Sequence, residues 1–489
     1  MKFNVFILLF LFISVNVCAQ DAAQGAAVSD KELQRQEEMQ EKEHKKQEEA
    51  KKRAEKKQEK EEQKLEREER RRKAAEKEPY SALVLDYNLR FQAAAYSNLN
   101  YRDAETPEWE NIFRQCLSVN IIGKFDDRIE MSAKLASYGL SGNQNEIFAM
   151  PYSDNGFSFF LESAYLNFRS EEYALIPYVF TVGKQYFSIG NGLIIDSNRN
   201  GFLGARAQAD LPLMLSIDAF AAKVDKQDFN IYGGNVKIKT YPLIEIGIYQ
   251  ERNNTGFAYQ KGILVDSAAY VIESDVKTFY NIALAGGKNK YNYRLEAAKQ
   301  TGELVKTSSG TVEYDVYAFL AEGSWQGTFF KRASNAKIMF SYADAENENS
   351  FNPTFAKRYD GLQRIGYGTL FAANNTDSLL ILPVGYGGIN TIGAKFDIAP
   401  WNFLQTGIAF YMFSASDAPA DAGDPGLAKL YGAKADLGNE FDFFVKYKYI
   451  DYFDAGFSFA LYTPPSGADK VFSNTEASYL YQIEVSARF

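Results

Sequence analysis

The sequence ends in the eleven residues Tyr479-Leu-Tyr-Gln-Ile-Glu-Val-Ser-Ala-Arg-Phe489, and this stretch predicts the fold. Its odd-numbered positions are apolar or aromatic, whereas its even-numbered positions from Gln482 onward are polar. Because successive side chains of a strand point to opposite faces, we expect a β-strand with one apolar and one polar face. The closing strand of a transmembrane β-barrel has this pattern, with lipid outside and water inside. An amphipathic edge strand of a soluble β-sandwich is the alternative.

The same alternation repeats from Ser81 onward, which favours the barrel. Short turns alternate with long polar loops along the chain, as expected when all the short turns lie at one end of a barrel. We expect 18 strands, an even number that places both chain ends in the periplasm; 16 strands would also fit. The expected strands lie near residues 82–96, 115–125, 128–138, 158–169, 178–187, 201–210, 213–223, 230–240, 242–251, 276–286, 290–300, 312–324, 335–344, 388–398, 402–413, 440–450, 453–462 and 479–489.

Composition supports this fold class and argues against an enzyme. Aromatic residues make up 15% of the chain, yet the mean hydropathy is only -0.33, a combination typical of strands that face water on one side. The single histidine, His44, lies outside the strand-rich body, which excludes Ser-His triads and histidine-ligated zinc there. No cofactor is expected. The acidic segments Glu346–Asn349 and Asp417–Asp424 contain oxygen ligands that calcium prefers, but we interpret them as solvated loops and expect no metal.

The N-terminal part of the chain differs from the barrel. Residues 1–19 predict a signal peptide cleaved after Ala19, because the apolar run Phe3–Val17 follows Lys2 and is followed by the cleavage site Val17-Cys18-Ala19. Residues 20–78 form a charged, low-complexity segment whose acid-to-base pairs at i,i+4 favour a solvated periplasmic helix, with a disordered linker as the alternative. Residues 79–489 are then the outer-membrane barrel.

Inward-facing charges are the candidate pore-lining residues. Residues 79–489 contain 35 Lys/Arg and 45 Asp/Glu, so the barrel is acidic overall although its expected lumen is mixed in charge. Lys184 shares the face of Phe180 and Val182, and would reach the lumen only if a bulge intervened. The candidates are Arg90, Lys124, Arg128, Lys134, Lys184, Arg206, Arg294, Lys395, Glu440, Asp442, Lys446 and Lys448.

Two stretches resemble the alginate-export family of outer-membrane porins. The first runs through Val182-Gly-Lys-Gln185, Gly190-Asn-Gly-Leu193, Asp196-Ser-Asn-Arg-Asn200 and Phe202-Leu-Gly-Ala-Arg206, and the second is Leu437-Gly-Asn-Glu-Phe-Asp442. The resemblance implies an 18-stranded monomeric barrel that passes an anionic polysaccharide through a basic lumen. The C-terminal strand also resembles the signal read by the barrel-assembly machinery, with Tyr481, Ile483, Val485 and Phe489 as its residues.

The sequence therefore predicts a passive porin for polar or charged solutes, among them oligosaccharides or polysaccharides. Its expected partners are outer-membrane lipid, the barrel-assembly machinery and the solute, with no nucleic acid. The alternative is a structural anchor, in which residues 30–78 link the barrel to a periplasmic or cell-wall partner.

Overall fold

The structure, a computed structural model, describes residues 82–99, 109–142, 159–171, 174–197, 201–224, 228–256, 259–260, 263–264, 272–306, 310–346, 349–357, 366–373, 378, 387–417, 435–465 and 475–489. The chain separates into two units, residues 1–78 and 79–489. The predicted signal peptide and charged helix both lie outside the described residues. The second unit is all-β, and no helix among its described residues is long and apolar enough to cross a membrane.

The main sheet contains 18 antiparallel strands within the described residues. The first nine are β1 (Ala82–Ser97), β2 (Trp109–Lys124), β3 (Ile129–Gly142), β4 (Phe160–Arg169), β5 (Tyr178–Gln185), β8 (Phe202–Leu211), β9 (Leu215–Lys223), β10 (Phe229–Ile238) and β11 (Leu243–Asn253). The other nine are β14 (Ile272–Lys288), β15 (Tyr291–Lys306), β16 (Gly310–Phe329), β17 (Arg332–Ala343), β20 (Gly387–Trp401), β21 (Leu404–Asp417), β22 (Ala435–Ile450), β23 (Phe453–Thr463) and β24 (Ser478–Arg488).

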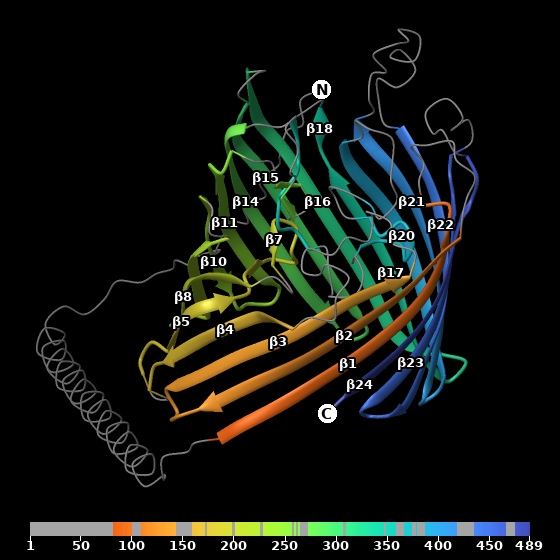
Figure 1. The fold of residues 1–489 in the computed structure, drawn as a ribbon, viewed down its shortest axis with the longest axis horizontal. Helices are drawn as coiled ribbons and strands as arrows, with labels where there is room; N and C mark the ends of the chain where they lie inside the picture. The colour runs from red at the N-terminus through yellow and green to blue at the C-terminus, as the bar shows by residue number, and fades with distance from the viewer. Residues whose placement is uncertain are drawn as a thin grey trace, which may run out of the picture. The chain divides into compact units, whose positions relative to one another are not determined.

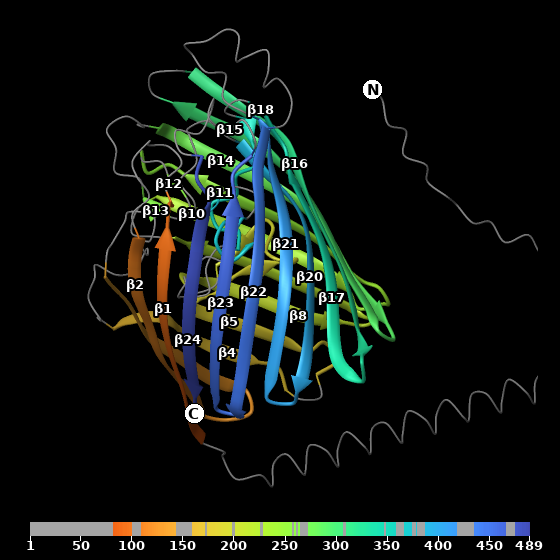
Figure 2. The same cartoon turned by 90° about the vertical axis from the view of Figure 1, so that its right-hand side faces the viewer.

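The sheet closes on itself because its first strand pairs with its last. β1 and β24 are antiparallel neighbours, with Asn88 opposite Arg488 and Ser97 opposite Tyr479. Figures 1 and 2 show these two strands side by side, although they are the ends of the sheet in sequence. The last residue completes the seam, since the backbone N–H and C=O of Phe489 each bond to Tyr87 at 2.9 Å. Closure leaves none of the 18 described strands as an edge with unpaired main-chain N–H and C=O groups. A sheet that spans lipid must be closed in this way, because lipid offers no hydrogen-bond partner for such groups.

Side chains alternate between the two faces as the sequence predicts. In β24, Tyr481 and Ile483 are exposed on the outside, whereas Leu480 and Gln482 are buried on the inside. Exposed aromatic rings gather near the short turns, where Trp401 stacks on Phe403 and Phe403 contacts Tyr447. Such rings are typical of the boundary between lipid and water.

The end with the short turns, called here the short-turn end, includes turns at 125–128, 289–290, 402–403 and 451–452. The Asp126 carboxylate accepts the N–H groups of Arg128 and Ile129, both at 2.7 Å, and these bonds lower the pKa of Asp126.

Arg128 was expected within a strand, but it belongs to this turn, because β3 begins only at Ile129. The expected loop 97–114 is also shorter, since β2 begins at Trp109.

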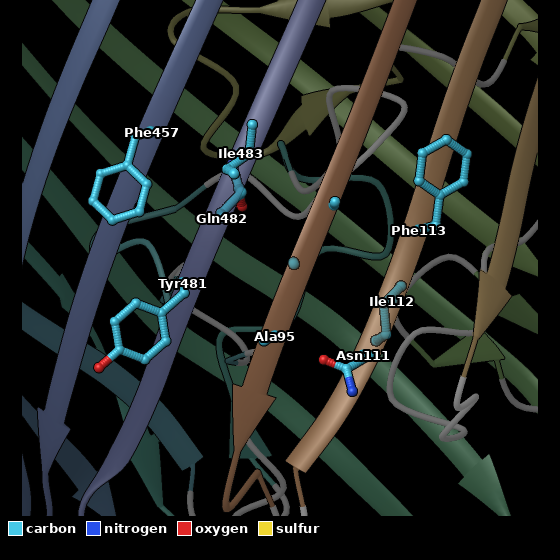
Figure 3. A pocket seen from close by; sticks show the side chains of 10 residues that line it. Ala95, Asn111, Ile112, Phe113, Phe457, Tyr481, Gln482 and Ile483 are labelled. Atoms are coloured by element: carbon cyan, nitrogen blue, oxygen red, sulfur yellow. The ribbon is translucent and has the colours of Figure 1, made fainter.

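Figure 3 shows an apolar groove at the seam, on the outward face of β1, β2, β23 and β24. Its volume is about 490 Å³, and the small side chains of Ala93 and Ala95 lie between the larger Phe113, Phe457 and Ile483. Since this face is apolar and outside the barrel, the groove does not belong to a route for polar solutes.

Candidate functional site

Three chain segments between the strands fold into the barrel and pack against its inner wall. We call them the first inner segment (residues 186–197), the second inner segment (residues 349–357) and the third inner segment (residues 366–373). The first contains the hairpin of β6 (Ser188–Ile189) and β7 (Ile195–Asp196). The second begins with β19 (Asn349–Ser350), which pairs with β18 (Ala345–Glu346). A third hairpin, β12 (Tyr259–Gln260) with β13 (Ile263–Leu264), lies outside these segments.

Apolar side chains bring the first inner segment into the barrel. Phe187, Ile189 and Ile195 are buried, and Phe187 stacks on Phe220 of β9 at 4.6 Å between ring centroids. The wall also supplies polar anchors, because buried carboxylates accept main-chain N–H groups. The N–H of Gly190 donates to Glu245 at 3.0 Å, and the N–H of Asn191 donates to Glu296 at 2.8 Å.

The second inner segment is held in the same way on the same side of the barrel. Thr354 donates its N–H and its hydroxyl to Glu251, at 2.9 and 2.5 Å. Asn352 and Gln300 exchange two hydrogen bonds of 2.8 and 2.9 Å. This segment also bonds to the first, because Lys357 N–H donates to the Gly192 carbonyl at 3.0 Å. The two segments therefore form one continuous layer inside the wall.

The third inner segment binds the opposite part of the wall, at β22. Glu440 accepts the N–H groups of Thr369, Leu370 and Phe371 at 2.6, 2.8 and 2.7 Å. Phe371 stacks on Phe413 of β21 with ring centroids 4.1 Å apart. The second and third segments belong to the same connection between β17 and β20. Its described parts therefore pack on opposite parts of the wall and narrow the lumen.

A cavity of about 340 Å³ remains between the inner segments and the wall of β15, β16, β17, β20 and β21. We call it the constriction cavity. Among the described residues that line it, the cations outnumber the carboxylates: Arg294, Lys337, Lys357 and Lys395 face Glu322 alone. Glu322 is already paired with Lys337 at 2.7 Å, and the Tyr367 hydroxyl approaches it at 3.4 Å. Burial and the Glu322 charge raise the pKa of Tyr367, which keeps this hydroxyl a donor.

A second cavity, of about 550 Å³, lies next to the first at the short-turn end. We call it the vestibule. Lys395 lines both cavities, so they are neighbours along the lumen. The charged side chains among its described lining are Arg90, Lys395, Lys446, Lys448, Arg488, Asp454 and Glu484. Phe444 lies between two of the cations, with the Lys395 and Lys446 nitrogens 4.5 and 5.6 Å from its ring centroid.

The sequence-predicted cations fall into two groups. Some line the cavities: Arg294, Lys395, Lys446, Lys448 and Arg90, of which Arg90 is paired with Glu484 at 2.6 Å and Lys448 with Asp451 at 3.0 Å. Others are bound to the wall, because Lys134 pairs with Glu162 at 3.0 Å and Arg206 Nε donates to Asp218 at 2.8 Å. Lys124 ends β2 beside the turn 125–128 and is exposed there.

Three expected pore-lining residues need correction. Lys184 lies on the outward face with Phe180 and Val182, because β5 pairs with β4 and β8 in unbroken register and its ammonium donates to the Leu161 carbonyl at 2.8 Å. Glu440 and Asp442 do face inward. They are buried beneath the third inner segment, however, so they hold that segment and do not line an open path.

Sequence reasoning missed Lys337, Glu322 and Lys357 as lining residues. Strand alternation was the available signal for Lys337, which shares a face with Asn335 and Met339 in an expected strand. Lys357 had no such signal, because it lies in a loop. The apolar runs Gly192–Ile195 and Thr369–Ala373 within polar loops were the only sign in the sequence that these loops fold inward.

No group of three or more candidate metal ligands occurs among the residues described. The acidic segments Glu346–Asn349 and Asp417–Asp424 lie mostly outside them.

The fold is similar to solved structures of outer-membrane porins. The outer membrane protein OprD from Pseudomonas aeruginosa matches with a TM-score of 0.50 and 8% sequence identity, over 85% of this chain and 95% of that chain. Acinetobacter baumannii OccAB4 matches with a TM-score of 0.48 and 10% identity, over 83% and 98% of the two chains. Comparison with protein-family models and with curated proteins gave no match. The likeness to OprD supports the barrel fold. None of the comparisons supports the alginate-export resemblance.

Proposed function

We propose that this protein is a passive outer-membrane channel for small anionic solutes. The observation that carries the proposal is the charge of the constriction cavity, where four cationic side chains face a single carboxylate among the described lining residues. Within the described part of the chain, Arg294, Lys395 and Lys446 form no ion pair. Cationic groups at a narrow, partly desolvated passage attract anions and exclude cations more strongly than charges elsewhere on the protein.

The acidic composition of the barrel does not oppose this proposal, because the buried carboxylates of the inner wall are already engaged. Glu251, Glu296 and Glu440 accept main-chain N–H groups of the inner segments. Asp218 and Glu162 are paired with Arg206 and Lys134. The charge that a solute meets is therefore set by the cations that remain free, and we expect it to be positive.

The size of the cavity favours small solutes over a polymer. A volume of about 340 Å³ between two inner segments suits a molecule of modest size. An extended polysaccharide, the substrate implied by the alginate-export resemblance, would require the inner segments to move aside. An oligosaccharide with one or two acidic groups is the largest ligand that this geometry favours.

The test is single-channel recording of the refolded full-length protein in a planar bilayer under a KCl gradient. We expect open steps whose reversal potential shows a preference for chloride. A reversal potential of the opposite sign would overturn the anionic solute and leave a cation-preferring porin. A folded barrel without conductance would overturn the channel and favour the anchor, which deletion of residues 30–78 would then test through its effect on envelope integrity.

A further inference from the structure

The third inner segment curls around the side chain of Glu440. The N–H and C=O groups of Tyr367 and Ala373 bond to each other at 2.7 and 2.8 Å, which closes residues 367–373 into a ring of main chain. Three N–H groups from within this ring point at the two oxygens of Glu440. Successive N–H groups that converge in this way form a nest for an anion, and here the wall supplies the anion.

The backbone of this segment is shaped for the carboxylate. Gly368 has φ +82°, and a Cβ at this position would lie 2.5 Å from a Glu440 oxygen. Ala372 also has a positive φ, of 47°, which few non-glycine residues adopt. Asp442 adds a second acceptor, since the Thr369 hydroxyl donates to it at 2.7 Å. Each hydrogen bond contributes to the docking, so together these contacts favour one position of the segment.

The same segment separates the two cavities of the lumen. Gly366, Tyr367 and Ala373 line the constriction cavity, and Thr369 lines the vestibule. The position of Tyr367 depends on this docking. Its hydroxyl reaches Glu322 on β16, the partner of Lys337, from a segment that is anchored on β22.

We propose that Glu440 is the positioning residue of the pore: its carboxylate fixes the third inner segment across the lumen and thereby sets the largest solute that passes. This inference rests on the proposed channel function. Glu440 does not contact the solute in this arrangement, because it is fully buried beneath the segment. It acts through Tyr367 and the main chain of residues 366–373.

The main test is Glu440→Gln in the full-length protein. The amide keeps one of the two oxygens that accept the three N–H groups and presents an NH₂ donor in place of the other, so docking of the segment should weaken. We expect single-channel conductance to rise about twofold or more, because a wider pore conducts more ions, and the size limit for neutral sugars in a liposome-swelling assay to increase. The sign of the reversal potential should stay unchanged, since the lining cations remain.

Gly368→Ala changes the third inner segment instead of the wall, and it leaves the Glu440 carboxyl group in place. Its Cβ would displace the segment from Glu440, so conductance and the sugar size limit should rise as in Glu440→Gln. Glu130→Gln is the matched control: this carboxylate also lies on the inner wall, but it bonds to Arg169 and Asn167 of β4 and to no inner segment. It should conduct as the wild type does.

The two proposals fail in different ways. Folding of Glu440→Gln and Gly368→Ala is judged by heat-modifiable migration on gels. If both variants fold and keep the wild-type conductance and sugar size limit, the role of Glu440 is overturned, whichever ion the channel prefers. If Glu440→Gln does not fold, the result with Gly368→Ala decides. A cation preference in the wild type together with larger pores in both variants would overturn the anionic solute and support the role of Glu440.

Discussion

Lys337 on β17 and Lys395 on β20 are direct cross-strand partners on the inner wall of the barrel. Like charges directly opposite each other destabilise a sheet by roughly 0.2–1 kcal/mol. Each lysine has a different compensating contact: Lys337 is paired with Glu322 at 2.7 Å, and Lys395 lies over the ring of Phe444. The stability of the sheet alone does not account for the two charges, whereas the proposed attraction of anions to the constriction would.

Lys395→Gln should therefore weaken anion preference without loss of stability. Lys395 lines both cavities, so its charge acts along the whole passage. We expect the chloride-to-potassium permeability ratio to fall by about twofold, measured as a reversal potential under a KCl gradient. The urea midpoint for unfolding in liposomes should stay constant or rise, because a like-charge contact is removed. A lower midpoint with an unchanged ratio would mean that Lys395 is structural.

Lys184→Gln should leave ion preference unchanged. The ammonium is on the outward face and donates to the Leu161 carbonyl, outside the lumen. The reversal potential of this variant should equal that of the wild type, which makes it the matched control for Lys395→Gln. A shift as large as that of Lys395→Gln would place Lys184 in the conduction path and contradict the face assignment.

Lys134→Gln should lower the free energy of unfolding, with only a small effect on conductance. Its partner Glu162 is fully buried and also accepts hydrogen bonds from Tyr138, at 2.8 Å, and from Tyr186. Removal of the ammonium leaves a buried carboxylate without its cation, which costs about 3–5 kcal/mol. The measurement is the free energy of unfolding from urea titration. Restored stability in the double variant Lys134→Gln with Glu162→Gln would identify the unpaired charge as the cause.

Deletion of Phe489 should lower the yield of assembled barrel. Its main chain bonds to Tyr87 across the seam at 2.9 Å in both directions, and the sequence predicts that its ring belongs to the assembly signal. Phe489→Ala keeps the main-chain bonds and removes only the ring. A defect in both changes, measured as the fraction of heat-modifiable protein in the outer membrane, would support the signal. A defect in the deletion alone would assign the effect to closure of the seam.

The strand layout was predictable because each strand carries its own pattern. All 18 expected strands occur within a few residues of their expected positions, since a two-residue alternation between lipid and water is a local property. The same alternation placed Lys184 on the outward face, and the continuous register of β5 confirmed that no bulge changes it. The prediction that Lys184 lines the pore is wrong, because this residue shares the outward face of Phe180 and Val182.

The candidate site was only partly predictable, because a count of inward charges does not show which of them remain free. Arg206 and Arg294 both face inward, but Arg206 is bound to Asp218 and Arg294 lines the constriction cavity. Asp218 lies opposite Gln208 and reaches Arg206 diagonally, whereas Glu322 lies opposite Arg294 but pairs with Lys337 of the next strand. The difference therefore depends on which neighbour each carboxylate reaches and on where the inner segments lie. Both are long-range relationships, and alternation within one strand carries no information about them.

The sequence by itself determined the barrel, its closing strand and the faces of its side chains, because these follow from residue type and two-residue periodicity. Only the tertiary structure decided that residues 186–197, 349–357 and 366–373 fold into the lumen. Their docking requires carboxylates such as Glu296 and Glu440 to meet main-chain N–H groups from segments about 70 or more residues away in the chain. These hydrogen bonds engage the acidic side chains of the wall, whereas Arg294 and Lys395 line the cavity that the inner segments leave.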